Sequence, residues 1–169
     1  MSVRVVFETH ATTEDNEAGV MTGWLPGRLS AAGRAQAAEL GARRADLRVV
    51  FASDLARAVE TARIAFPDLD VLLDWRLREC DYGSLNGAPR AHRGADDRYP
   101  GGETWREAVA RVDRFLDELV ATRDGERVLV IGHMAARYAL ARRSGGASLE
   151  EVLAEEFVWQ PGWEIELSG

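Results

Sequence analysis

Short apolar runs rich in β-branched residues alternate along this chain with segments that have the composition of helices. The runs cover residues 3–7, 47–52, 71–73, 128–131 and 163–167. Such an alternation brings strands together as mostly parallel neighbours, with helices on both faces of the sheet. With 169 residues, of which 46% are hydrophobic, the chain can bury one core of ordinary size. We therefore predict a single α/β domain over residues 1–169, a three-layer αβα sandwich around a mostly parallel central sheet.

Helix signals separate these runs. Ser30 is a good N-cap for a helix over 30–44, and Ser53 is expected to cap a helix over 54–65. The segment 104–121 has apolar residues at helical spacing, so we expect it to be a scaffold helix with a solvated charged face. A further helix is expected over 133–142, and Ser148 with Glu151 forms a capping box that opens a short one. The polar, glycine-containing segments 8–29 and 80–102 are expected to be loops, the second of them a lid.

The charge balance excludes several classes of partner. The formal net charge is −7, which argues against a nucleic acid or an anionic membrane surface as the main partner. No apolar run approaches the roughly 20 residues that span a bilayer, and the first residues run directly into a strand, so we expect a cytoplasmic protein. Cys80 is the single cysteine, which fits a reducing compartment and a buried, inert thiol.

Four residues with catalytic chemistry follow the predicted strands. His10 follows the run 3–7 and His133 follows the run 128–131, while Arg57 and Glu79 come after the second and third runs. The carboxyl ends of parallel strands meet at one edge of a sheet, where sites of this fold class lie. Each residue alone has a structural explanation, such as a surface ion pair for Glu79 between two arginines. Together they predict a site at the carboxyl edge.

Six segments in succession resemble the histidine phosphatase superfamily, which has the phosphoglycerate-mutase-like fold. They extend over about residues 3–145 and carry the family pattern in its order. The segments are 9–16, with Thr-His-Ala and a later Asn; 23–37; 53–62, with Ser-Asp and Arg57; 77–83, with Leu-Arg-Glu; 99–104, with Gly-Gly-Glu-Thr; and 128–133, which ends in Gly-His.

The resemblance implies a phosphomonoesterase that acts on a small phosphorylated metabolite without a metal or other cofactor. His10 would attack phosphorus and form a phosphohistidine. Arg57 and His133 would bind the phosphoryl oxygens, and Glu79 would protonate the leaving group. The residues expected to contact the substrate or to fix His10 are Asn16, Thr13, Thr9, Trp24, Arg28 and Arg137.

The chain departs from the family pattern beside both histidines. Thr9 stands in place of an arginine, Ala11 in place of a glycine, and Met134 in place of a second glycine. Loss of a charged donor from such a site typically costs about 10²–10³ in rate. Three explanations are open. In the first, another arginine fills the space, namely Arg28, Arg137, Arg90 or Arg93. In the second, Thr9 marks a subgroup with a different substrate, and in the third the protein binds phosphate ligands without turnover.

Three other functions remain open at this point. A phosphoglycerate-type mutase is disfavoured because the chain is short and the 84–98 loop is small. A non-catalytic protein that binds phosphate ligands is supported by Thr9. A metallohydrolase ranks last because no helix carries a histidine pair at ligand spacing. His92, in a basic patch of the 84–98 loop, is interpreted as a solvated loop residue.

Overall fold

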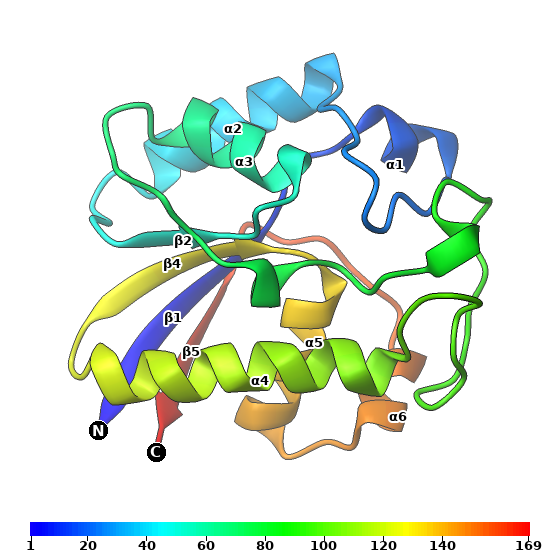
Figure 1. The fold of residues 1–169 in the computed structure, drawn as a ribbon. Helices are drawn as coiled ribbons and strands as arrows, with labels where there is room; N and C mark the ends of the chain where they lie inside the picture. The colour runs from blue at the N-terminus through cyan, green and yellow to red at the C-terminus, as the bar shows by residue number, and fades with distance from the viewer.

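A five-stranded sheet lies between two layers of helices in the computed structural model, which describes all 169 residues (Figure 1). The strand order is β3-β2-β4-β1-β5. The four strands β1 (Ser2–Thr9), β2 (Val50–Ala52), β3 (Leu72–Leu73) and β4 (Arg127–Gly132) are parallel, and β5 (Trp163–Ser168) pairs antiparallel with β1. The predicted αβα sandwich with a mostly parallel sheet is confirmed, and β4, the most hydrophobic run, is central.

The two central strands supply side chains alternately to the two faces of the sheet. On β1, Val5 and Phe7 belong to the larger core with α4 (Trp105–Thr122), α5 (Met134–Gly145) and α6 (Leu149–Ala154). Val6 belongs instead to the smaller core with α2 (Ala31–Arg43) and α3 (Ala56–Ala65). This alternation is the period of a strand that is buried on both faces. Figure 1 shows the two helical layers on opposite sides of the sheet.

Helix starts show where local hydrogen bonds override the sequence signals. Ser148 caps α6 with the complete capping box that the sequence indicates, and α4 has a second complete capping box at Thr104. The third helix, α3, begins at Ala56 rather than at residue 54. Ser53 Oγ accepts instead from the Leu55 amide at 3.2 Å, and Asp54 forms two 2.7 Å hydrogen bonds with Arg78. These side-chain bonds hold the two residues in a turn outside the helix.

The segments predicted as loops contain short helices. Within 8–29 lies α1 (Glu14–Ala18), which begins with a capping box between Thr13 and Asn16. The 3-10 helices η1 (Trp75–Leu77) and η2 (Gly83–Leu85) follow β3. The second and third strands are shorter than their apolar runs. No helix has the length and apolar character needed to cross a bilayer.

Gly33 allows α2 to pack directly against the chain that follows His10. A Cβ at Gly33 would lie 1.9 Å from the Thr12 carbonyl oxygen, so no side chain fits there without backbone movement. At Gly145, on α5, a Cβ would meet no atom within 4 Å. Gly33 and Gly145 therefore differ in physical role, the first allowing a close approach of backbone and the second having no packing requirement.

Replacing Gly33 by alanine should lower the free energy of unfolding by about 1–3 kcal/mol, because the added methyl forces α2 away from Thr12. The matched change Gly145→Ala should raise it by up to about 1 kcal/mol, since alanine restricts the unfolded chain. Urea denaturation of both variants measures the difference. Equal stability of the two variants would contradict the packing role of Gly33.

Candidate active site

The two central strands bring His10 and His133 together. In the β1–β4 pairing Thr9 lies opposite Gly132, and the His10 amide donates to the Gly132 carbonyl at 3.0 Å. Each histidine thus leaves its strand at the same level of the sheet. Their ring centroids are 5.0 Å apart. This register explains why both histidines lie at one edge of the sheet, as predicted.

The hydrogen bonds of the His10 ring define its tautomer. Nδ1 lies 2.8 Å from the Ala11 carbonyl oxygen, which only accepts, so Nδ1 carries the proton. Nε2 is therefore unprotonated, and its lone pair accepts from Arg57 Nε at 3.3 Å. Burial, followed by the charge of Arg57, lowers the pKa of His10 to about 3. The ring is accordingly neutral near pH 7, with Nε2 as its nucleophilic atom.

Arg57 is buried and anchored by backbone carbonyls. Its side chain is 2% exposed, and its Nη1 and Nη2 groups donate to Leu25 and Gly23 at 3.0 and 2.8 Å. Thr61, one turn further along α3, donates to the Arg57 carbonyl and accepts from the Ala11 amide. These bonds fix the guanidinium next to the reactive face of His10.

Glu79 lies at the amino end of α5 and satisfies amides that have no partner inside the helix. Its carboxylate accepts from the Met134 and Ala135 amides at 3.3 and 3.2 Å, and from the Cys80 amide at 2.9 Å. Burial raises the pKa of Glu79, while these amides and the charge of Arg57 oppose the increase. A carboxyl group that retains its proton more readily is suited to general acid catalysis.

His133 is 1% exposed, and neither of its ring nitrogens has a hydrogen-bond partner. Burial, with smaller contributions from Arg57 and His10, lowers the pKa of His133 well below its usual value. Two unpaired nitrogens in a buried ring are costly unless a ligand or solvent satisfies them. His133 is therefore a neutral ring that is available to an anionic ligand, whose charge would favour its protonation.

A cavity of about 760 Å³ contains the site. Its lining includes the four residues predicted to be catalytic, His10, Arg57, Glu79 and His133, together with Thr9 and Asn16. The Asn16 Oδ1 atom accepts from the Thr13 amide at 3.0 Å, which leaves the side-chain NH₂ group of Asn16 as a donor. No group of three or more His, Cys, Asp or Glu side chains is arranged to hold a metal ion.

Two residues expected to contact the substrate or to fix His10 lie outside the cavity and contact residues that line it. Thr13 is fully buried, and its hydroxyl accepts from the Asn16 amide as the cap of α1. The Trp24 indole donates to the Glu79 carbonyl at 2.7 Å, and its ring lies 4.7 Å from the Arg78 guanidinium. Neither residue lines the cavity. Their contacts instead position Asn16 and Glu79.

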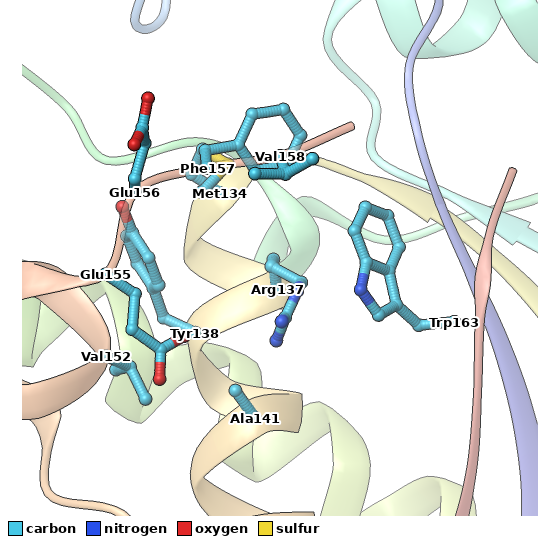
Figure 2. Close-up of a pocket in the computed structure, with 10 residues that line it drawn as sticks. All are labelled: Met134, Arg137, Tyr138, Ala141, Val152, Glu155, Glu156, Phe157, Val158 and Trp163. Atoms are coloured by element: carbon cyan, nitrogen blue, oxygen red, sulfur yellow. The ribbon is translucent and has the colours of Figure 1, made fainter. Parts of the chain in front are cut away.

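Two arginines expected near the phosphate lie outside the cavity. Arg28 pairs with Glu14 at 3.0 Å and is 77% exposed. Figure 2 shows Arg137 in a small adjoining pocket of about 40 Å³, which shares Met134 and Tyr138 with the cavity. The Arg137 guanidinium lies 5.1 Å from the Trp163 ring centroid. The lysine-free chain contributes only Arg57 and Arg90 as arginines of the cavity lining.

Arg111 is the main residue that the sequence did not reveal. The expectation that the charged face of α4 is solvated is wrong at this position, because Arg111 is 2% exposed. It forms two hydrogen bonds with Glu103 and donates to the carbonyls of Arg76, Arg78 and Glu79. The position of Arg111 in the helix pattern does not distinguish it from an exposed charged residue. Its role becomes visible only when the fold brings residues 76–79 against it.

The cavity lining also includes residues that the sequence did not single out for the site. The segment 155–159, between α6 and β5, contributes four residues to the lining, and Tyr82, Tyr99, Trp105 and Tyr138 add aromatic surface. His92 is exposed, as expected for a loop, but it also lines the cavity, and its ring lies 3.1 Å from the Leu153 carbonyl oxygen. Cys80 is buried, as the sequence suggested, and burial raises the pKa of its thiol.

Comparisons with known proteins agree with this geometry. The family described as histidine phosphatase superfamily (branch 1) matches residues 5–157. A 2,3-bisphosphoglycerate-dependent phosphoglycerate mutase of Methylobacterium sp. (strain 4-46) is 33% identical over 175 residues, covering 88% of this chain and 83% of that protein. The mutase of the same description from Neisseria meningitidis serogroup C is 28% identical over 206 positions, covering 91% and 90%.

Among solved structures, the chain is similar to a mycobacterial glucosyl-3-phosphoglycerate phosphatase in complex with VO₃. The TM-score is 0.80 at 27% identity, and the match covers 89% of this chain and 86% of that one. The Neisseria alignment spans 206 positions although this chain has 169 residues, so that relative carries insertions that are absent here. The similar proteins thus include both mutases and a phosphatase.

Replacing Arg111 by methionine should lower the free energy of unfolding by about 3–5 kcal/mol, because Glu103 and three carbonyls lose a buried charged partner. Arg114→Met, at an exposed position of the same helix, should change it by less than about 0.5 kcal/mol. Urea denaturation distinguishes the two variants. A loss at Arg111 no larger than at Arg114 would refute the anchoring role.

The buried histidines should make stability fall in acid. Between the lowered pKa of folded His133 and about 6.5, the unfolded chain binds a proton that the folded chain does not. The free energy of unfolding therefore decreases as pH falls through this window. Relative to His133→Asn, wild type should lose about 2 kcal/mol between about pH 7.5 and pH 5. Parallel pH profiles from urea denaturation would contradict a neutral His133.

Proposed function

The chain belongs to the histidine phosphatase superfamily, and on that basis we propose that it is a phosphomonoesterase that hydrolyses a small phosphorylated metabolite through a phosphohistidine on His10. The observation that carries the proposal is the unprotonated Nε2 atom of His10. It lies 3.3 Å from Arg57 Nε, in the same cavity as His133 and Glu79. A nucleophile, two phosphate-binding side chains and a carboxylic acid are the groups that this reaction requires.

In the first step, Nε2 attacks phosphorus and the bond from phosphorus to the ester oxygen breaks. Glu79 gives its proton to the leaving oxygen, so the alcohol departs neutral. Arg57 binds non-bridging oxygens, and His133, protonated in the presence of the bound anion, donates to another. Both groups are held in advance by the protein, which favours the charge distribution of the transition state without reorganisation.

In the second step, water attacks phosphorus and the bond from phosphorus to Nε2 breaks. Glu79, now ionised, accepts a proton from this water, which restores both groups to their starting state. The Ala11 carbonyl keeps the Nδ1 proton in place throughout, so Nε2 is the atom that receives and releases the phosphoryl group. Hydrolysis is thereby complete with no metal ion in the steps.

A mutase is the second candidate, because two similar proteins are phosphoglycerate mutases. A mutase must retain its phosphoenzyme against water until the phosphoryl group is returned to a substrate. The insertions of the Neisseria relative, which could shield a phosphoenzyme from water, are absent from this chain. Their absence favours hydrolysis over transfer.

The decisive experiment measures phosphate release from a panel of phosphomonoesters in the presence of a metal chelator. Wild type should release phosphate, and His10→Ala should lower kcat/KM by about 10³-fold or more, since the nucleophile is absent. Wild-type enzyme quenched during turnover should carry the acid-labile phosphate that is expected of a phosphohistidine. Binding of phosphate compounds without any release would instead support the non-catalytic alternative, and activity that depends on a bisphosphorylated cofactor would support a mutase.

The role of Glu79 predicts a dependence on the leaving group. Glu79→Gln should lower kcat/KM, which reports the first step alone, by about 10²–10⁴ for alkyl phosphates, because their alkoxides need a proton. The loss should be much smaller for 4-nitrophenyl phosphate, whose leaving group is stable as an anion. Glu39→Gln, at an exposed position of α2, serves as the matched control. An equal loss with both ester types would rule out proton donation by Glu79.

A further inference from the structure

The four residues predicted to be catalytic provide little net positive charge for binding a dianionic phosphate ester. Arg57 carries one positive charge, and Glu79, when ionised, carries one negative charge. His10 and His133 are neutral in the free protein because burial lowers the pKa of both rings. Arg57 also uses three of its N–H groups on His10, Leu25 and Gly23. A second cationic group would balance the charge of a bound phosphate.

Only one other residue of the cavity lining is a permanent cation. The chain has no lysine, and among its 21 arginines only Arg57 and Arg90 line the cavity. The Arg90 guanidinium forms no ion pair and no hydrogen bond with the rest of the chain, and the residue is exposed. Most arginines of this protein pair with carboxylates. Arg90 is therefore a free guanidinium beside the predicted phosphate site.

The backbone at Arg90 is held next to the end of α1. Its amide donates to the Gly19 carbonyl at 3.2 Å, and Pro89 forms an antiparallel bridge with Val20. Gly19 is the C-cap of α1, the helix that carries Asn16. In Figure 1 the loop after η2 accordingly runs beside the segment around α1. Arg90 and Asn16 therefore line the cavity from adjacent segments of the chain.

We propose that Arg90 binds the phosphoryl group of the substrate together with Arg57, and supplies the positive charge that Thr9 does not provide. The guanidinium offers a planar pair of donors that matches two phosphoryl oxygens. Because Arg90 belongs to the 84–98 loop, this loop supplies the positive charge, and the end of β1 does not. This inference rests on the proposed phosphate chemistry of the site, and its test does not require turnover.

Binding of inorganic phosphate by calorimetry tests the contact directly. Arg90→Met should raise the Kd of phosphate by about 10- to 100-fold, the usual effect of removing a hydrogen bond between charged groups. Arg90→Lys, which keeps the charge but not the paired donors, should fall between wild type and Arg90→Met. The control is Arg93→Met in the same loop, because Arg93 lies 5.3 Å from the Tyr99 ring centroid and does not line the cavity.

Arg93→Met should leave the Kd of phosphate within about twofold of wild type, because this half-buried residue does not line the cavity. In turnover, Arg90→Met should lower kcat/KM by the same factor for esters with neutral and with anionic alcohols. An unchanged phosphate Kd in Arg90→Met would overturn the proposal. So would a kinetic loss confined to anionic alcohols, which would assign Arg90 to the leaving group. Phosphate binding without turnover in wild type would refute the proposed hydrolysis while the Arg90 comparison still stands.

Discussion

The parallel pairing of β1 with β4 is the constraint on which the site depends. Its register sets Thr9 opposite Gly132, so both strands end together and each is followed by a histidine. The His10 amide extends the ladder by one further bond to Gly132, which fixes the start of the chain that leaves the sheet. A shift of one residue in this pairing would turn one of the two rings away from the other. The chemistry therefore depends on a backbone register formed by two strands more than 100 residues apart.

The surrounding structure holds the charged groups with backbone atoms. Arg57 donates to two carbonyls, and Glu79 accepts from three amides, two of them at the start of α5. Backbone partners are rigid, so the side chains need little rearrangement when a charged ligand binds. The same burial keeps both histidines neutral in the free protein. The expected loss of stability in acid and the nucleophilicity of His10 near neutral pH therefore have one physical cause.

Several features of the fold and site were predictable from sequence because their signals are local. The apolar runs identified the strands, and the capping box at Ser148 identified the start of α6 to the residue. The start of α3 was placed two residues early, because Ser53 and Asp54 bond to Leu55 and Arg78 instead of capping the helix. Arg111 was assigned to solvent, because its neighbours in the fold come from residues 76–79 and 103, which the periodicity of α4 does not reveal.

The sequence by itself determined the alternation of strands and helices, the family, and the positions of His10, Arg57, Glu79 and His133 after successive strands, since hydrophobic period and motif order are properties of the chain. Only the tertiary structure decided which arginines reach the cavity. The sequence favoured Arg28 and Arg137 over Arg90 and Arg93, but Arg28 pairs with Glu14, Arg93 packs on Tyr99 and Arg137 packs on Trp163. Arg90 alone of these four lines the cavity. Long side chains take their direction from neighbours brought together by folding, and that information is not local in the sequence.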